Sequence, residues 1–264
     1  MIQFVETGKC RKLFPGIASL GILRLDLPDP IAGGNKQYKL RHHLEAFRRS
    51  GRKRIVSFGG AYSNHIAALA YAGKVNALPV TGIIRGEELT ADANAVLRFA
   101  QECGMELRFI SREDYHRRYD DTWHNELSQL YDAYVVPEGG SGEEGIRGCM
   151  EILGEHTSVY DVILVASGTG ATTEGLRRSA MDHQLVTGID VVDRNSEFAC
   201  GGYGRNSEEL MKFIEEMKCE LDLPLDHVYT GKTLMAIRDL SQRGELAEKS
   251  VLFVHTGGYA FVSP

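Results

Sequence analysis

The segment Gly33-Gly34-Asn35-Lys36 carries the first side chain that could do chemistry. Two glycines let the backbone approach a ligand closely, and Lys36 follows them at the start of a predicted helix. A lysine amine in a closed pocket, its pKa lowered by the surroundings, is a nucleophile or a general base. Taken alone, Lys36 is a surface lysine at a helix start, so its role depends on the other segments.

A second segment, residues 57–65, runs from a predicted strand through Gly59-Gly60 into a predicted helix. Ser63 and Asn64 stand at the start of that helix, where a hydroxyl, an amide and unpaired backbone N–H groups occur together. This set of donors suits an anionic carboxylate. A plain helix N-cap explains Ser63 and Asn64 equally well.

A third segment, residues 165–173, again runs from strand through a Gly/Thr loop into a helix. Backbone N–H groups and threonine hydroxyls at a helix N-terminus make a phosphate cradle. A competing interpretation is a dinucleotide-binding unit, because Gly168-x-Gly170 is followed by a helix and by a strand that ends at Asp190. The third glycine of that fingerprint is replaced by Thr173, which weakens the dinucleotide interpretation.

Two further segments adjoin predicted elements near the C-terminal end. Residues 228–232, Val-Tyr-Thr-Gly-Lys, precede a helix, and His255-Thr256-Gly257-Gly258 closes the last strand. Capping and turn chemistry explain either segment by itself.

The elements that must position these side chains alternate along the chain. Apolar runs rich in Val and Ile predict strands, and the amphipathic segments between them predict helices, so we expect an α/β fold of open parallel sheets wrapped by helices. The predicted strands are Ile22–Leu25, Arg54–Phe58, Val80–Ile84, Glu106–Ile110, Tyr134–Val136, Asp161–Val165, Leu185–Asp190 and Val251–His255. The predicted helices are Gln37–Arg49, Asn64–Gly73, Ala91–Cys103, Asp114–Tyr131, Gly145–Leu153, Thr172–His183, Ser207–Lys218 and Lys232–Arg243.

Parallel sheets bind ligands at the carboxyl ends of their strands, and the glycine-rich turns follow strands. The strand–helix units between about residue 40 and residue 138 could form a compact sub-sheet. We therefore predict two lobes, a small one of residues 40–137 and a large one of residues 1–39 and 138–264.

Composition excludes several classes of protein. With 264 residues and a net charge of −6, the chain is globular and does not resemble a nucleic-acid-binding protein. The basic residues 48, 49 and 52–54 end a predicted helix, where cations suit the helix dipole. The 5 cysteines of the chain lie far apart in the sequence, which favours reduced thiols over a zinc site or disulfides. No signal peptide or run of ~18 apolar residues is visible, so we expect a cytoplasmic location without membrane contact.

Taken together and in order, the segments resemble the 1-aminocyclopropane-1-carboxylate deaminase and D-cysteine desulfhydrase family, which has the tryptophan synthase β-like fold. A weaker match, Gly202-Tyr203-Gly204, falls where the family carries an active-site tyrosine. The matching segments are Gly-Gly-Asn-Lys-x-x-Lys-Leu at 33–40, Gly-Gly-x-x-Ser-Asn at 59–64, Thr-Gly-Ala-Thr at 169–172, Val-Tyr-Thr-Gly-Lys at 228–232 and His-Thr-Gly-Gly at 255–258.

The resemblance implies pyridoxal 5'-phosphate as the cofactor and Lys36 as the lysine that carries it as a Schiff base. Asn64 would contact its phenolic oxygen, and Ser63 with nearby amides would hold the substrate carboxylate. The resemblance implies no metal, and we expect a homodimer. The phosphate would be held by Gly168, Thr169, Gly170, Ala171 and Thr172.

Further positions carry the choice of reaction. The resemblance makes Tyr203 and Tyr229 proton carriers and puts Thr230 and Thr256 near the pyridine nitrogen. In the deaminase branch of the family, Glu and Leu stand where this chain has Thr230 and Thr256. A hydroxyl leaves that nitrogen unprotonated, so the electron sink is weaker and direct loss of a β-substituent is favoured.

We therefore expect a lyase that converts a small amino acid, D-cysteine or a relative, to pyruvate, sulfide and ammonia. Three alternatives remain open. One is a 1-aminocyclopropane-1-carboxylate deaminase, racemase or other lyase on the same cofactor. Another is a catalytically degenerate protein that binds the cofactor, since the stretches before Gly33 and between Asp190 and Tyr203 are shorter than in the family. The third is a dinucleotide-dependent oxidoreductase.

Overall fold

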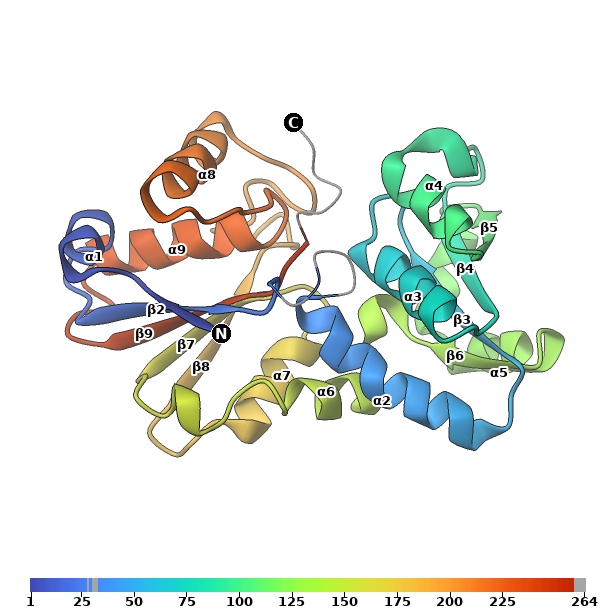
Figure 1. Cartoon of the computed structure of the whole chain (residues 1–264). Helices are drawn as coiled ribbons and strands as arrows, with labels where there is room; N and C mark the ends of the chain where they lie inside the picture. Colours follow the sequence, from blue (N-terminus) through green and yellow to red (C-terminus); the bar gives the residue numbers. More distant parts are fainter. Residues whose placement is uncertain (28, 30–32, 259–264) are drawn as a thin grey trace. The chain divides into compact units, whose positions relative to one another are not determined.

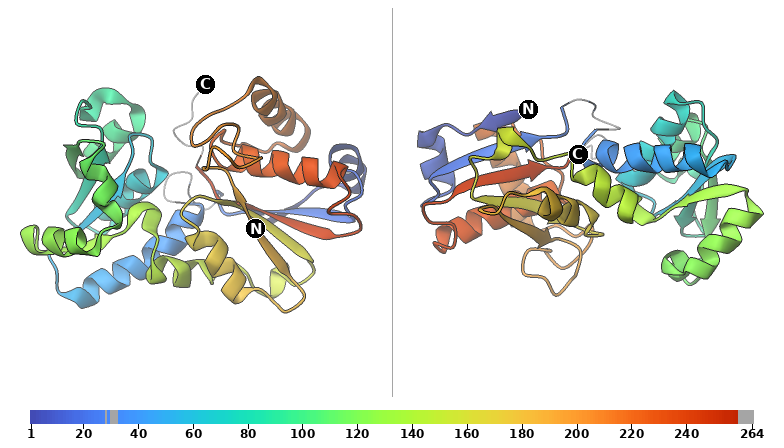
Figure 2. Two further views of the ribbon diagram at one scale, coloured as in Figure 1. Left: turned by 180° about the vertical axis from the view of Figure 1, so that it is seen from behind. Right: turned by 90° about the horizontal axis from the view of Figure 1, so that it is seen from below.

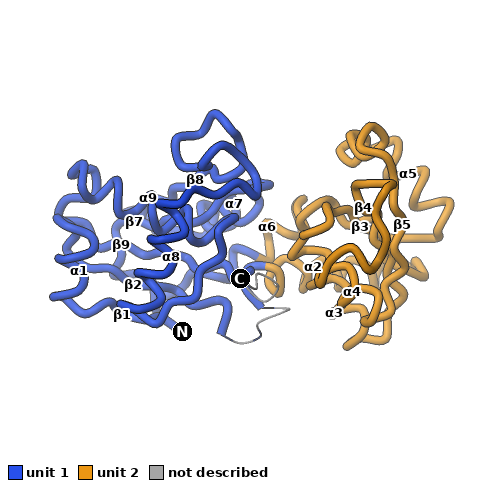
Figure 3. The backbone as a smooth tube through the Cα atoms, turned by 90° about the horizontal axis from the view of Figure 1, so that it is seen from above, with its two compact units in different colours: residues 1–35, 149–264 blue, residues 36–148 orange. Residues whose placement is uncertain are grey.

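The structure is a computed structural model that describes residues 1–27, 29 and 33–258 (Figure 1). The chain forms two compact units, which Figure 3 distinguishes by colour: unit 1 is Met1–Asn35 with Cys149–Pro264, and unit 2 is Lys36–Gly148. The sequence puts the corresponding boundaries at 39/40 and 137/138. Helix α2 (Asn35–Ser50) begins at the first observed boundary, and the predicted boundary 39/40 falls within its first turns.

The second boundary follows from close packing inside unit 2. A Cβ atom built on Gly148 would lie 2.0 Å from the carbonyl oxygen of Tyr38, and one on Gly145 would lie 2.0 Å from that of Gly140. Helix α6 (Glu143–Cys149) therefore packs against the start of α2 and the turn after the unit's last strand. This packing keeps residues 138–148 with unit 2.

Unit 1 is built on a five-stranded sheet with the order β1-β2-β9-β7-β8, in which all neighbours except β1 and β2 are parallel. The antiparallel β1 and the seven-residue helix α1 (Thr7–Leu13) are absent from the predicted elements, because both are too short to show a periodic pattern. The strands are β1 (Ile2–Phe4), β2 (Ser19–Arg24), β7 (Val162–Ser167), β8 (Leu185–Asp190) and β9 (Ser250–His255).

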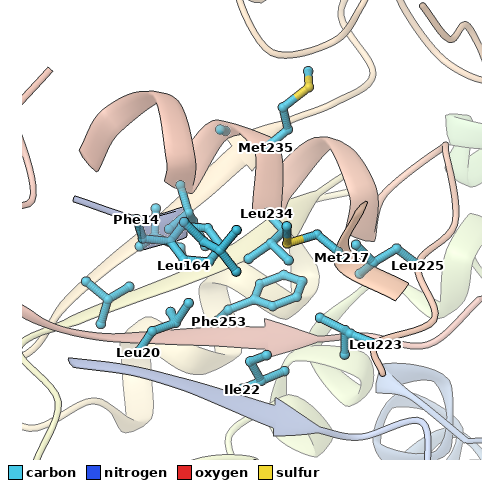
Figure 4. Close-up of a cluster of buried hydrophobic side chains, with 14 of the residues drawn as sticks. Phe14, Leu20, Ile22, Leu164, Met217, Leu223, Leu225, Leu234, Met235 and Phe253 are labelled. Carbon is cyan, nitrogen blue, oxygen red and sulfur yellow. The ribbon is translucent and has the colours of Figure 1, made fainter. Parts of the chain in front are cut away.

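Both faces of this sheet are covered. Helices α8 (Glu208–Leu221) and α9 (Thr230–Gln242) lie on one face, and α7 (Ala171–Ser179) lies on the other (Figures 1 and 2). Alternate strand residues such as Leu164 and Phe253 pack under α9 in one apolar core, and Figure 4 shows their side chains. Covering both faces explains why the central strands are almost continuously apolar.

Unit 2 is built on a four-stranded parallel sheet with the order β5-β4-β3-β6. Neighbouring residues of β3 face opposite sides: Ile55 packs with α2, α3 and α4, whereas Val56 packs with Trp123 of α5. The remaining elements are β3 (Arg54–Gly59), β4 (Val80–Arg85), β5 (Glu106–Ile110), β6 (Ala133–Val136), α3 (Asn64–Val75), α4 (Ala95–Glu102) and α5 (Asp121–Leu130).

Two predicted helices are each divided in the structure. The predicted helix 91–103 becomes a short 3₁₀ turn and α4, because Asn94 caps α4 by accepting a hydrogen bond from the Leu97 N–H at 3.0 Å. The predicted helix 114–131 divides at Asp120, which accepts from the Thr122 N–H at 2.8 Å. Short polar side chains that bond to the backbone break a helix that amphipathic spacing alone would continue.

The predicted α/β class is confirmed by these two parallel-rich, helix-wrapped sheets. In unit 1 the carboxyl ends of β2, β9, β7 and β8 lie at one edge of the sheet. In unit 2 the carboxyl ends of β3, β4, β5 and β6 do the same. Within the described ranges, no helix has the length and apolarity that a membrane crossing requires.

Three residues of the basic cluster, which follow α2, pair with acidic neighbours. Arg52 and Lys53 both pair with Asp132, at 3.2 and 3.5 Å, and Arg54 pairs with Glu106 at 2.6 Å. The cluster therefore forms ion pairs within unit 2.

Candidate active site

The loop between β7 and α7 has the features of an anion cradle. Gly170, at φ 80°, precedes α7, and no side chain caps the helix. A Cβ atom on Gly170 would meet nothing within 4 Å, so the space beside the loop is open. The first backbone N–H groups of α7 and the hydroxyls of Thr169 and Thr172 are donors that suit a phosphate dianion.

The start of α2 is fastened to this loop within unit 1. The Asn35 side-chain amide donates to the Thr172 hydroxyl at 2.8 Å, and the Asn35 N–H donates to the Thr256 carbonyl at 3.2 Å. Gly34 has φ 69°, and a Cβ atom there would lie 2.0 Å from the Thr256 carbonyl oxygen, so only glycine fits. The residue that follows this anchored pair in the chain is Lys36.

The two lysines of the first motif differ in their surroundings. Lys39 is only 3% exposed, and its ammonium donates to the Gly139 carbonyl at 3.3 Å. Lys36 is partly exposed, and its positive charge contributes to lowering the pKa of His65. Burial thus commits Lys39 to the framework of unit 2, whereas Lys36 keeps access to solvent.

Ser63 is the N-cap of α3, as the simpler interpretation of its segment predicts. Its hydroxyl accepts a hydrogen bond from the Ile66 N–H at 3.3 Å. A Cβ atom on Gly59 would lie 2.4 Å from the Ile66 side chain and 2.8 Å from the Ser63 hydroxyl oxygen. Glycine is therefore required where β3 meets α3, and Asn64 occupies the first position of the helix.

His65 is a buried residue next to Asn64 for which the sequence predicted no role. The Ser57 hydroxyl donates to the Val136 carbonyl at 2.8 Å, so it accepts from His65 Nε2 at 2.8 Å. Burial first, and then the charges of Lys36, His43 and Lys39, hold the pKa of His65 well below its usual value. The ring is neutral, and its Nδ1 is a buried acceptor without a hydrogen-bond partner among the described residues.

The two tyrosines predicted as proton carriers lie together in unit 1. The Tyr203 and Tyr229 rings meet edge to face, with centroids 6.1 Å apart and planes at 67°. A Cβ atom on Gly168 would lie 3.3 Å from Tyr229 Cε1, so this ring borders the cradle loop. Tyr203 is 44% exposed, which leaves one face of the pair accessible to solvent.

Thr230 and Asp226 bond reciprocally at the start of α9. The Thr230 hydroxyl donates to the Asp226 carboxylate at 2.5 Å and accepts from the Asp226 N–H at 2.9 Å. The same carboxylate accepts from the N–H groups of Val228 and Tyr229, at 2.8 and 2.7 Å. The Thr230 hydroxyl hydrogen is therefore committed to Asp226, whereas Thr256 is joined to Asn35 through its backbone carbonyl.

A buried ionic network holds the strand end before Thr256. Arg24 donates two hydrogen bonds to Asp26, at 2.8 and 2.6 Å, and His255 Nδ1 lies 3.1 Å from the same carboxylate. Burial alone would raise the pKa of Asp26, but the hydrogen bonds and charges of Arg24 and His255 hold it well below its ordinary value. The network ties the carboxyl ends of β2 and β9 to each other.

The geometry argues against the dinucleotide interpretation. The Asp190 carboxylate accepts from the N–H groups of Val192 and Asp193, at 2.9 and 3.0 Å, and so closes a local turn. Close contact between helix and strand is provided by Gly188, where a Cβ atom would lie 2.6 Å from the Thr173 hydroxyl oxygen. Among the described residues, no group of three His, Cys, Asp or Glu side chains is placed to hold a metal ion.

Curated relatives cover most of the chain, although no protein-family model matches it. A protein of Pyrococcus horikoshii named "Putative 1-aminocyclopropane-1-carboxylate deaminase" is 29% identical over 91% of this chain and 85% of its own. The "Bifunctional D-cysteine desulfhydrase/1-aminocyclopropane-1-carboxylate deaminase, mitochondrial" of Arabidopsis thaliana is 26% identical over 92% and 73%. The "D-cysteine desulfhydrase" of Klebsiella pneumoniae is 25% identical over 89% and 86%.

Solved structures show the same fold. The crystal structure of an "ACC deaminase homologue" superposes with a TM-score of 0.85 at 26% identity and covers 99% of this chain and 90% of its own. Serine racemase from Dictyostelium discoideum matches with a TM-score of 0.71 at 13% identity, over 97% and 93%, a likeness of fold alone. The predicted tryptophan synthase β-like architecture is thereby confirmed.

Proposed function

Since the chain belongs to the 1-aminocyclopropane-1-carboxylate deaminase and D-cysteine desulfhydrase family of lyases, we propose that it eliminates the β-substituent of a small amino acid with pyridoxal phosphate. D-Cysteine is the substrate that we propose, and pyruvate, sulfide and ammonia are the products. The observation that carries the proposal is the Asn35–Thr172 hydrogen bond of 2.8 Å. It joins the backbone before Lys36 to the β7–α7 loop, whose donors suit a phosphate.

The residues present fit the cofactor. Gly168 to Thr172 would hold the phosphate. The space at Gly170 is open, and no side chain caps the start of α7, so the first N–H groups of the helix could donate to the phosphate. We propose unit 1 as the large, cofactor-binding lobe. Lys36 would carry the cofactor covalently, and Asn64 would donate to its phenolic oxygen. When bound, pyridoxal phosphate supplies the sink for the electron pair left on the substrate α-carbon.

Hydroxyl groups at the ring nitrogen would set the reaction type. We assign the hydrogen bond to this nitrogen to Thr256, because the Thr230 hydroxyl hydrogen is committed to Asp226. Thr230 would then order the start of α9 through its hydrogen bonds to Asp226, without contacting the ring nitrogen. A neutral donor leaves the nitrogen unprotonated and the sink weak, which favours direct loss of a good leaving group such as thiolate.

The other side chains of the chain would hold the substrate and move its protons. Ser63 and the first N–H groups of α3 would bind the substrate carboxylate and present one face of the α-carbon to Lys36. Once the substrate amine has displaced it, the free Lys36 amine would remove the α-proton while thiolate leaves the β-carbon. Tyr203 and Tyr229 would exchange protons at the departing group, and the released enamine would hydrolyse to pyruvate and ammonia.

A substrate panel tests the proposal. The purified protein, loaded with pyridoxal phosphate, is offered D-cysteine, L-cysteine and 1-aminocyclopropane-1-carboxylate, while sulfide, pyruvate and 2-oxobutyrate are measured. We expect sulfide and pyruvate from D-cysteine and little 2-oxobutyrate. The Thr230→Glu/Thr256→Leu double variant should depress the first activity. Strong 2-oxobutyrate production with D-cysteine inert would overturn the assignment.

The deaminase is the second candidate, since two of the relatives carry that activity in their names. The panel also covers a racemase, by chiral analysis of unreacted substrate, and a catalytically degenerate protein, which would bind the cofactor with no turnover. We further propose a cytoplasmic homodimer. All 5 cysteines are free thiols, which supports a reducing compartment, and light scattering of the loaded protein tests the dimer.

A further inference from the structure

Lys232 is a buried ammonium for which neither the family resemblance nor the proposed mechanism has a use. It lies in the first turn of α9 within unit 1 and is 0% exposed. Removing an ammonium from water costs several kcal/mol unless the protein satisfies its three N–H donors. No carboxylate of the described residues forms an ion pair with it.

Its hydrogen bonds all go to one stretch of backbone. Lys232 Nζ donates to the carbonyl oxygens of Ala199 at 2.6 Å, Gly202 at 2.9 Å and Val191 at 3.4 Å. With three donors on three acceptors, the ammonium is saturated and cannot act as an acid or a base on a ligand. Burial lowers the pKa of Lys232, partly opposed by Cys200 and Asp226.

The stretch that Lys232 holds, residues 191–204, contains no helix or strand. Cys200, Gly201, Gly202 and Gly204 all have positive φ values, between 50° and 120°. The stretch has turn hydrogen bonds of its own, such as that from the Gly202 N–H to the Ala199 carbonyl at 2.9 Å, but it lacks the continuous bonding of a helix or strand, so contacts from outside add to its order. Lys232 supplies these at the beginning of the stretch and on both sides of residue 200.

One of the three carbonyls, that of Gly202, belongs to the residue before Tyr203. Tyr229, the partner of Tyr203, is the N-cap of the same helix that carries Lys232. One turn of α9 therefore places Tyr229 through the chain itself and Tyr203 through the hydrogen bonds of Lys232.

We infer that Lys232 is a positioning residue, which fixes the backbone at Gly202 so that the Tyr203 ring meets Tyr229 in a geometry able to pass a proton. The inference rests on the proposed function for the role of the two tyrosines. The hydrogen bonds from Lys232 to the backbone before Tyr203 are observed independently of that role.

The first test is a double-mutant cycle on turnover. Lys232→Met keeps the length of the side chain and removes the donors, and Tyr203→Phe removes the phenol. Each alone should lower kcat by about 100-fold, the lower end of what one positioned acid–base group contributes, with cofactor affinity unchanged. The double variant should be no worse than Tyr203→Phe, because Lys232 acts through Tyr203. Independent, multiplying effects would overturn the inference.

The second test needs no turnover. Hydrogen exchange should quicken in residues 191–204 of Lys232→Met and stay unchanged in the strands. The near-ultraviolet circular dichroism that Tyr203→Phe removes from the parent should be missing from Lys232→Met. If the parent proves inactive, these readouts still decide the position of Tyr203; unchanged exchange and an intact tyrosine signal would refute it.

Two further variants make the test specific. Lys232→Gln keeps two donors at a shorter reach, so it should fold where Met does not and show a smaller change in exchange at 191–204. The matched control is Arg243→Gln, which removes an exposed ion pair between the C-cap residue of α9 and Glu197 of the same stretch. It should leave kcat and the tyrosine signal unchanged; a loss equal to that of Lys232→Met would contradict the inference.

Discussion

The β7–α7 turn of unit 1 and the β3–α3 turn of unit 2 have the same local plan, a parallel strand, glycines and a helix start, but they end differently. At α3 the Ser63 hydroxyl caps the helix, and Gly59 is packed tightly against Ser63 and Ile66. At α7 no side chain caps the helix, and the space at Gly170 is open. The β3–α3 turn satisfies backbone N–H groups with its own Ser63 side chain, whereas the β7–α7 turn leaves N–H donors for a ligand.

This difference suits the two anions that the proposed reaction requires. A resident phosphate, with two charges, can supply the missing cap of α7 permanently. A substrate carboxylate must come and go, and α3 stays capped by Ser63 when it has left. The following changes would break or sharpen this contrast.

The largest effect is expected for Lys36→Ala. Without the carrier amine, the visible absorbance of the bound cofactor should vanish, and turnover should fall by at least about 10³-fold, within the range that acid–base groups contribute. Lys39→Ala is the matched control, because that buried ammonium bonds to the Gly139 carbonyl. It should lower stability and keep the absorbance. A Lys39→Ala protein that is colourless beside a coloured Lys36→Ala protein would reverse the assignment.

The next effect concerns the open turn. Thr169→Val with Thr172→Val should weaken pyridoxal phosphate binding at least tenfold, since each charge-assisted bond contributes about 1.5–3 kcal/mol. Titration of the cofactor-free protein measures this. Thr173→Val is the control, because the Thr173 hydroxyl is buried and bonds to none of the described residues. Equal affinity in the double variant and the parent would locate the phosphate elsewhere.

A smaller effect is expected at the closed turn. Ser63→Ala should lower the free energy of unfolding by about 1 kcal/mol, through loss of the cap, and should raise KM several-fold. Ser63→Asp separates the two roles. A carboxylate caps a helix as well as a hydroxyl does, so stability should return, while its charge repels the substrate carboxylate and KM should rise further. If KM recovers together with stability, Ser63 serves the helix alone.

Sequence reasoning located these turns because strands and glycines leave local patterns. The predicted bounds of β5 and β8 match the structure, and the motif residues lie at strand ends as expected. Contacts between distant residues leave no such pattern. Asn35 acts through Thr172, and Lys232, which resembles an exposed lysine at a helix start, is buried by carbonyls 30 to 41 residues away. The sequence likewise predicts that the Thr230 hydroxyl is available to a ligand, but in the structure this hydroxyl donates its hydrogen to Asp226.

The smallest effect tests the framework behind the closed turn, through the pH dependence of stability. Burial and nearby positive charges lower the pKa of His65, so the folded protein keeps this ring neutral while the unfolded chain protonates it below about pH 6.5. Below that value the unfolded state binds one more proton, and the free energy of unfolding falls by up to about 1.4 kcal/mol per pH unit until the folded pKa is reached. His43, whose pKa burial also lowers, adds a slope of the same sign. His65→Gln should lose its own share of the slope between pH 6.5 and 5, as measured by urea unfolding, and exposed His183→Gln should not. An unchanged slope in His65→Gln would mean that the ring is charged in the folded protein at these pH values, so that Nδ1 would be a donor and not the buried acceptor described above.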